Sequence, residues 1–352
     1  MEYYIGCDAH KKYSVMAGLS ETVEILPAER VEHDKETYRL FLRTLPTGSR
    51  IAVESVGNWY WMIDEIEKAG HQPFLVHAAR AKLMMGQVNK TDKLDAMGLA
   101  VLARNGTLPV VWVPPGELRD KRELPRMRMV LVSMRTRLKN RIHAIFAKYG
   151  ITFPDVSDLF GGKGRRLMEA SLWELPPETR LSVVQQLQLI DQVEQSIKEA
   201  EKRIGEVIKQ DPAMQLLKTM PGVGALLAIT IALEMGEVTR FPSAEKFASY
   251  AGKTPRVSSS GGKTRYGRVR ADVNRYLKWA FTEAANAIVL QQHSLGDCHV
   301  LRLYWRVRRR GGHAKAITAV GRHLAEAAYW MLQKQEAYRE PERHTMALAV
   351  KG

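Results

Sequence analysis

Short apolar runs and amphipathic segments alternate over the first hundred residues of this chain. The apolar runs predict strands over residues 3–7, 13–19, 21–26, 50–53 and 72–76. Apolar positions at steps of three and four predict helices over residues 35–45, 59–69, 78–85 and 91–104. The predicted order is therefore three strands, a helix, a strand, a helix, a strand and two helices.

This order is typical of a ribonuclease-H-like domain, an α/β fold with a mixed sheet, and we expect that fold here. In this arrangement the first and fourth strands lie side by side and run parallel. Asp8 follows the first apolar run and Glu54 follows the fourth, so we expect both carboxylates at one edge of the sheet. The helix predicted over residues 91–104 can cross the same edge.

After Val113-Pro114-Pro115-Gly116 the pattern becomes mainly helical. Two long amphipathic segments carry apolar residues at helical steps, and they could form an antiparallel pair or a dimerising coiled coil. Their apolar positions are Leu124, Met127, Leu131, Met134, Leu138 and Ile145 in the first, and Val183, Leu187, Ile190, Ile197, Ile204 and Ile208 in the second. The glycine-containing stretch 154–177 between them is predicted to be flexible.

The last region begins at Asp211-Pro212, and helices are predicted over residues 225–233, 271–290 and 314–331. Met220-Pro221-Gly222-Val223-Gly224 is typical of a helix-hairpin-helix turn, whose amides can bind a phosphate. A purely structural turn between helices would use the same residues.

Charge is distributed unevenly along the chain. Residues 1–115 hold 13 Lys and Arg against 14 Asp and Glu, whereas the remainder holds 40 against 24, so all of the net charge of +15 arises after Pro115. Such an excess favours a polyanionic partner, above all nucleic acid. No apolar run is long enough to span a bilayer, no signal peptide is visible, and Cys7 and Cys298 are expected to be ordinary thiols. We expect no membrane partner and a cytoplasmic location.

Arginines crowd the first long helix and a second cluster near the C-terminus. A solvated polar face explains most such runs, but no acidic residue lies between Arg126 and Lys148, which favours contact with phosphate. The clusters comprise Arg119, Arg122, Arg126, Arg128, Arg135, Arg137 and Arg141, and then Arg302, Arg306, Arg308, Arg309 and Arg310.

The stretch from Asn89 to Ala96 carries Asp92 and Asp95, which share one face of the predicted helix. Acidic residues are also common in the first turn of a helix, with Thr91 as N-cap. Together with Asp8 and Glu54, however, they predict four converging carboxylates. Oxygen ligands of this kind suit Mg²⁺ or Mn²⁺ and could hold two ions for phosphoryl transfer.

Ser258-Ser259-Ser260-Gly261-Gly262 lies among basic residues in a segment predicted to be a mobile loop. A flexible linker would have the same composition. A serine among arginines could instead attack a phosphodiester, with the cations countering the developing charge. The candidate nucleic-acid contacts are Arg256, Lys263, Arg265 and Arg268, together with Arg135 and Arg308 from the two arginine clusters.

Five stretches together resemble the DEDD transposases of bacterial insertion sequences, bridge-RNA-guided serine recombinases with a RuvC-like N-terminal domain. They are Tyr4 to Asp8, Val53 to Gly57, Asn89 to Ala96, Met220 to Gly224, and Gly252-Lys253-Thr254-Pro255 running to Ser260-Gly261. The resemblance covers residues 3–113 and 215–290. It implies a RuvC-like metal-binding domain over 1–115, a basic helical or coiled-coil region over 116–210, a C-terminal transposase domain over 211–340 and a tail over 341–352.

The resemblance also implies roles for individual residues. Asp8, Glu54, Asp92 and Asp95 would bind magnesium or manganese, and Ser260 would be the nucleophile that forms phosphoserine–DNA intermediates. The serine triplet leaves Ser258 and Ser259 open if the register differs. A structured noncoding guide RNA would specify donor and target double-stranded DNA. The tetrad of one protomer would act with the serine of another, in a dimer or a tetramer, at the bacterial nucleoid.

Two other functions remain open. A RuvC-like nuclease, such as a junction resolvase, would hydrolyse DNA with activated water and form no covalent adduct. A non-catalytic nucleic-acid-binding protein would use the same carboxylates structurally.

Overall fold

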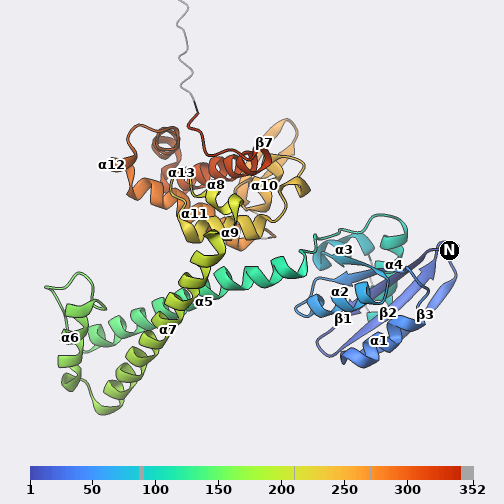
Figure 1. Cartoon of the computed structure of the whole chain (residues 1–352), viewed down its shortest axis with the longest axis horizontal. Helices are drawn as coiled ribbons and strands as arrows, with labels where there is room; N and C mark the ends of the chain where they lie inside the picture. The colour runs from blue at the N-terminus through green and yellow to red at the C-terminus, as the bar shows by residue number, and fades with distance from the viewer. Residues whose placement is uncertain (87–90, 210, 270–271, 342–352) are drawn as a thin grey trace, which may run out of the picture. The chain divides into compact units, whose positions relative to one another are not determined.

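A computed structural model describes residues 1–86, 91–209, 211–269 and 272–341 (Figure 1). The chain divides into two compact units, Met1–Pro114 and Pro115–Gly352. Asn89 and Lys90, and Ala271 at the predicted start of a helix, lie outside the described residues. Among the described helices, none combines the length and the apolar character that a membrane crossing requires.

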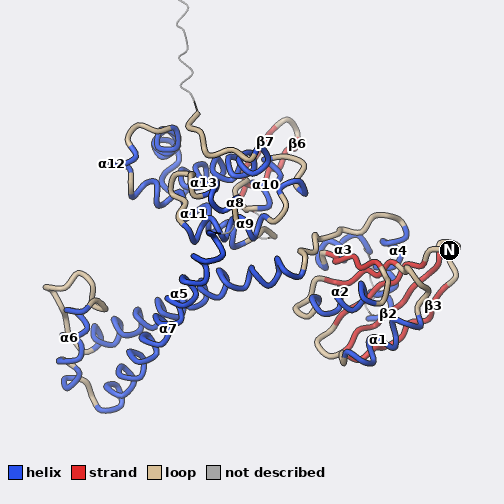
Figure 2. The backbone as a smooth tube through the Cα atoms, in the orientation of Figure 1, coloured by secondary structure: helices blue, strands red, loops and turns tan. Residues whose placement is uncertain are grey.

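The first unit contains a five-stranded mixed sheet in the order β3-β2-β1-β4-β5 (Figure 2). The central strand β1 pairs antiparallel with β2 and parallel with β4. The predicted parallel pairing of the first and fourth strands is therefore confirmed. The strands are β1 (Tyr3–Ala9), β2 (Tyr13–Ser20), β3 (Ile25–Glu32), β4 (Arg50–Glu54) and β5 (Gln72–Val76).

Two helices cover each face of this sheet. On one face, α1 (Lys35–Thr44) and α2 (Trp59–Lys68) pack on Ile5 and Cys7 of β1. On the other face, α3 (Ala78–Met85) and α4 (Asp92–Arg104) pack around Tyr4 and Ala52. Because side chains alternate along a strand, Asp8 shares the second face with Tyr4, on the side of α4.

The predicted position of the third strand is wrong. Residues 21–22 form a turn, Val23 has a φ of +71°, and the strand begins only at Ile25. The strand includes Pro27, whose missing N–H argues against a central strand. Since β3 lies at the edge of the sheet, it can accommodate a residue without an N–H donor.

In the second unit, α5 (Gly116–Lys148) and α7 (Pro177–Lys209) pack along each other as an antiparallel pair. Arg128 pairs with Glu201, with an N–O distance of 2.6 Å, and Lys139 pairs with Glu194 at 3.4 Å. Residues later in α5 thus meet residues earlier in α7. All six apolar positions predicted for the second segment are buried on α7. Dimerisation through a coiled coil stays a prediction.

The stretch between these helices is folded, so its prediction as a flexible connection is wrong. It contains α6 (Gly162–Ala170) and the short 3₁₀ helix η1 (Leu172–Glu174). Met168 is fully buried in a cluster with Ile142 and Phe146 of α5. Gly164 lies against the backbone carbonyls of Asp158 and Leu159, where a β-carbon would not fit.

The rest of the second unit is a helical domain with one hairpin. Its core is a continuous cluster of apolar residues from α8 to α13. Gly222, with a φ of +74°, packs against the backbone of α11 at Ala284, which gives the Met220–Gly224 turn a structural role. The elements are α8 (Pro212–Leu217), α9 (Ala225–Met235), η2 (Val238–Arg240), α10 (Ala244–Tyr250), β6 (Pro255–Ser260), β7 (Lys263–Val269), α11 (Arg275–Leu290), α12 (Gln292–Leu295) and α13 (His299–Lys334), whose helix is kinked at Gly312.

Several arginines of α5 have acidic partners from distant segments. Arg126 makes two hydrogen bonds, of 2.7 and 3.1 Å, to the carboxylate of Glu234, which is fully buried. Arg122 is also buried and donates to the backbone carbonyl oxygens of Leu233 and Glu234. The inference of phosphate contact from absent acidic partners is therefore wrong for these residues, because α9 and α7 supply the partners.

Candidate functional site

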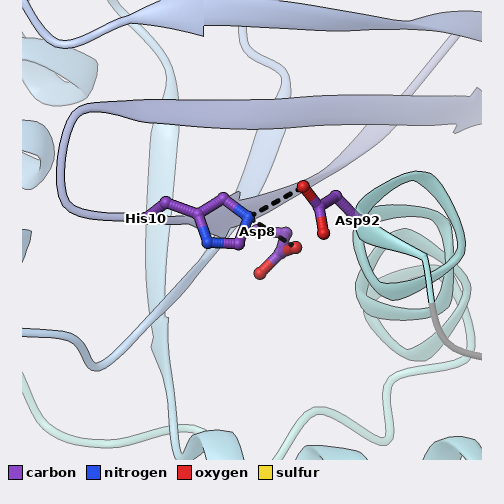
Figure 3. A group of neighbouring side chains, drawn as sticks. All are labelled: Asp8, His10 and Asp92. Atoms are coloured by element: carbon purple, nitrogen blue, oxygen red, sulfur yellow. Dashed lines mark ion pairs between the residues drawn. The ribbon is translucent and has the colours of Figure 1, made fainter.

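Asp8, His10 and Asp92 form a tight group in the first unit (Figure 3). The Nε2 atom of His10 lies 3.1 Å from Oδ2 of Asp92 and 3.4 Å from Oδ2 of Asp8. One potential ligand atom from each residue lies within 4.8 Å of the others. The structure thus brings together the first strand and the start of α4, as the sequence predicts for Asp8 and Asp92.

Local structure explains this convergence. Thr91 caps α4 by accepting a hydrogen bond from the amide of Leu94, which places Asp92 at the first position of the helix. Asp8 is close to the end of β1 and only 7% exposed. Burial makes its negative charge costly unless a cation or a donor compensates it.

Glu54 and Asp95 lie beside this group without joining it. Cys7 pairs with Val53, so Glu54 occupies the next position of the strand adjacent to Asp8. Asp95 follows Asp92 by one turn of α4 and is partly buried. All four predicted carboxylates are therefore on neighbouring positions of β1, β4 and α4. Asp8 and Asp92 are the two that make the close contacts to His10.

His10 is the residue that the sequence analysis missed. A signal for it exists: Asp8 and His10 are two positions apart at the end of a strand, and alternate residues of a strand share a face. Its Nε2 lies between two carboxylate oxygens, where either an N–H donor or a divalent cation would offset their charge.

The donors present fit a hard divalent cation. Carboxylate oxygens are ligands of Mg²⁺ and Mn²⁺, and of these two metals imidazole nitrogen is better suited to Mn²⁺. The hydroxyl of Tyr13 donates a hydrogen bond of 3.2 Å to Oδ2 of Asp92. Burial, and then the bond to Asp92, raise the pKa of Tyr13, which therefore remains a donor at neutral pH.

A polar network fixes the backbone at His10. The side-chain amide of Asn58, the residue before α2, donates to the carbonyl oxygen of His10 at 3.1 Å and lies 3.1 Å from Nδ1 of His33. On the other side of the ring, Nε2 of His33 is 2.7 Å from the hydroxyl of the buried Ser14. Burial lowers the pKa of His33, so the neutral ring is favoured. This network ties the turn after β1 to β2 and α2.

Ser260 lies in a β-hairpin, where the sequence analysis predicts a mobile loop. Strands β6 and β7 pair antiparallel, and Gly261 and Gly262 connect them with φ values of +56° and +73°. Two consecutive positive φ angles are the pattern of a type I′ turn, which favours glycine at both positions. Ser260 is the last residue before that turn.

The hairpin separates the three serines by face. Ser260 pairs with Lys263, and Ser258 pairs with Arg265, so these four side chains share one face. Ser259 pairs with Thr264 on the opposite face, and their hydroxyl oxygens lie 3.5 Å apart. We call the face that carries Lys263 and Arg265 the basic face. Ser258 and Ser260 lie on this face, and Ser259 lies on the other.

The other predicted nucleic-acid contacts differ in their surroundings. Arg256 and Arg268 belong to the same hairpin and are exposed. Arg135 of α5 lies 3.9 Å from Glu194, so part of its charge is neutralised within the chain. Arg308 of α13 places its guanidinium 4.8 Å from the centroid of the Trp305 ring.

Two family models match the chain. A transposase model for the DEDD type of IS110 matches residues 5–151, which include the Asp8, His10 and Asp92 group. A model described as the transposase IS116/IS110/IS902 family matches residues 214–297, which include the Ser260 hairpin.

Curated relatives extend the similarity over nearly the whole chain. A probable family 20 transposase of Pseudomonas aeruginosa is 23% identical, over 95% of this chain and 98% of its own length. The transposase for insertion sequence element IS1111A of Coxiella burnetii is 24% identical, over 95% of this chain and 91% of its own length. The transposase for element IS1328 of Yersinia enterocolitica is 27% identical over 64% of this chain and 66% of its own.

Proposed function

This chain is a transposase that belongs to the IS110/IS116 family of DEDD transposases, and from that membership we propose a metal-assisted serine mechanism for it. In this proposal the protein inserts and excises a mobile DNA element through covalent phosphoserine–DNA intermediates and strand exchange. A noncoding guide RNA pairs with donor and target DNA, so base pairing selects the sequences.

The observation that carries the proposal is the convergence of Asp8 and Asp92 on His10 Nε2. Asp8, Glu54, Asp92 and Asp95 would hold the metal, with His10 as a further donor. Bound Mg²⁺ or Mn²⁺ would stabilise negative charge on the phosphodiester during strand cleavage. Asn58 holds the His10 backbone, and Tyr13 holds the Asp92 carboxylate, so that the ligand atoms stay oriented.

Ser260 is the proposed nucleophile. Its hydroxyl oxygen loses its proton and forms a bond to phosphorus, while the bond from phosphorus to one deoxyribose oxygen breaks and that oxygen takes up a proton. The reverse reaction with another strand end rejoins the DNA and frees the serine. Lys263 and Arg265, on the same face of the hairpin, would counter the developing charge. The two glycines of the turn leave the serine accessible to a DNA backbone.

We further propose that the chain acts as a homo-oligomer, in which one protomer supplies the metal ligands and another supplies Ser260. An exposed apolar stripe on α5 supports association between copies. Met127 is 46% exposed, Val130 57% and Met134 39%, and they follow one another at helical steps on one face. We propose that the oligomer acts on DNA at the bacterial nucleoid.

A RuvC-like nuclease that uses activated water is the alternative, and the cluster of carboxylates in the first unit favours it as well. The two mechanisms differ in one product. Incubation with Mg²⁺, the guide RNA and donor and target DNA, followed by denaturing electrophoresis, should show a covalent protein–DNA adduct. Cleavage of the DNA without any adduct would refute the serine mechanism and support the nuclease.

A further inference from the structure

A cavity of the second unit is lined by residues of α12, of the loop after it and of the first half of α13. It has a volume of about 660 Å³, and its walls include Arg302, Arg306, Arg309, Arg310 and Trp305. Residues 302, 305, 306 and 309 follow helical steps of three and four, so they form one stripe along α13. Gln292, His293 and Asp297 also line the cavity.

Among the described residues, much of the positive charge in this cavity has no acidic partner. Arg302 is neutralised by Asp297, at an N–O distance of 3.1 Å. Within the described part of the chain, no ion pair is found for Arg306, Arg309 or Arg310. A cavity with several cations and one carboxylate is suited to a ligand with more than one negative charge.

Trp305 adds a second type of recognition to the cavity. Although it is a large aromatic residue, 38% of its surface is exposed. Tyr304 packs edge-on against its ring, and the guanidinium of Arg308 lies near the same ring. Tyr304 is itself buried and bonded to Nδ1 of His313, at 2.8 Å, across the kink at Gly312. Tyr304, which packs against the Trp305 ring, is therefore held by both halves of α13.

We propose that this cavity binds an unpaired nucleotide of a single-stranded or looped nucleic acid. The base stacks on Trp305, and the adjacent phosphates pair with Arg306 and Arg309. Gln292 and His293 offer hydrogen-bonding groups to the base edge. The volume is too large for a lone phosphate to fill, and in a duplex the base faces are occupied by stacking. The inference rests on the proposed function, whose nucleic-acid partners the cavity would bind, but the site needs neither the metal ligands nor Ser260.

The test measures binding of the full-length protein in EDTA to three fluorescent probes: a single-stranded DNA, an RNA hairpin with an unpaired loop, and a duplex DNA. Trp305→Ala should weaken binding of a probe with unpaired bases about 5- to 100-fold, while duplex binding changes less than about twofold. Loss for the RNA hairpin alone identifies an RNA loop as the ligand, and loss for single-stranded DNA alone identifies a displaced strand. An Arg306→Gln, Arg309→Gln double variant should also lower the salt dependence of binding.

Trp330→Ala is the matched control, because Trp330 is 51% exposed on the same helix with Lys334 near its ring. It should bind all three probes normally. Circular dichroism confirms that each variant is folded, and Trp305→Phe should retain most of the binding. Equal losses for Trp305→Ala and Trp330→Ala, or no loss for Trp305→Ala, would overturn the proposal. Because binding is measured in EDTA and no strand is cleaved, the result is separate from the catalytic mechanism.

Discussion

Gly6 of β1 lies directly against the main-chain carbonyl of Ala96 in α4. A β-carbon at position 6 would overlap with that carbonyl oxygen and would lie 2.8 Å from Cβ of Leu99. The absence of a side chain at Gly6 therefore allows α4 to approach the strand that carries Asp8. Close packing of a helix on a strand here determines how near Asp92 comes to Asp8.

Gly6→Ala should destabilise the first unit and separate its carboxylates. Forcing a methyl group into a packed contact costs about 1–3 kcal/mol in the free energy of unfolding. Urea denaturation measures the loss, and Mg²⁺ titration of the folded variant should show weaker binding. Gly57→Ala is the control, because its β-carbon would meet no atom within 4 Å, and it should be nearly neutral. Equal effects of both variants would disprove the role of the Gly6 contact.

Replacing one carboxylate should separate metal binding from folding. Asp92→Asn removes one of two close negative charges, so without metal the variant should unfold at the same or a higher temperature. At one hundred times its dissociation constant, Mg²⁺ should stabilise the wild type by about 2.7 kcal/mol and so raise its melting temperature. The melting temperature of the variant should not change when Mg²⁺ is added. Strand cleavage should be lost.

Glu67→Gln, which changes an exposed acidic residue of α2, should keep both the metal response and the cleavage. Cleavage by Asp92→Asn at wild-type rates, or a normal Mg²⁺ shift in its melting temperature, would exclude Asp92 as a ligand.

The three serines of the hairpin should differ in their effect on adduct formation. Ser260→Ala should abolish the covalent protein–DNA product without changing the melting temperature, because the side chain is exposed. Ser259→Ala should retain the product, since its hydroxyl lies on the face opposite Lys263 and Arg265. Peptide mapping of the trapped adduct identifies the modified serine. Attachment at Ser258, which shares the face of Ser260, would move the nucleophile by two residues, and attachment at Ser259 would contradict the role of the basic face.

The parts of the site that the sequence predicts follow from local rules. Apolar runs and helical steps define β1, β4 and α4, and the right order of elements places Asp8, Glu54 and Asp92 at one sheet edge. His10 was missed because the turn that follows β1 was not assigned a conformation. In contrast, the partners of the α5 arginines were not predictable from local sequence. Glu234 is 108 residues from Arg126 along the chain, and only the tertiary fold brings them together.

The hairpin and the third strand also combine features that local sequence predicts with features that depend on the rest of the fold. Gly261-Gly262 is a signal for a two-residue hairpin turn, but the hydroxyl-rich composition of 258–260 favours a linker when read alone. The edge position of β3, which tolerates Pro27, depends on how the other strands pair. In both segments local composition was therefore insufficient to determine the backbone conformation.

Lys253 should make the second unit less stable at neutral pH than an apolar residue would. The side chain is only 3% exposed, and Nζ donates a hydrogen bond of 2.6 Å to the hydroxyl of Thr282. Burial, and then the nearby Lys278, lower the pKa of Lys253 to about 8. An unfolded lysine titrates near ~10.4, so between these values the unfolded chain binds more protons and the free energy of unfolding rises with pH. Below about pH 8 both states are protonated, and the full cost of burying the ammonium is present.

Lys253→Met should therefore raise the free energy of unfolding at pH 7 by about 1–3 kcal/mol. The difference from the wild type should shrink as the pH rises from about 8 towards 10, because the wild-type lysine then becomes neutral in the folded state. Urea denaturation at pH 7, 8, 9 and 10 measures both effects, with the exposed Lys246→Met as control. A loss of stability at pH 7 would show that the bond to Thr282 outweighs the cost of burial. A difference that does not change with pH would show that folding does not lower the pKa of Lys253.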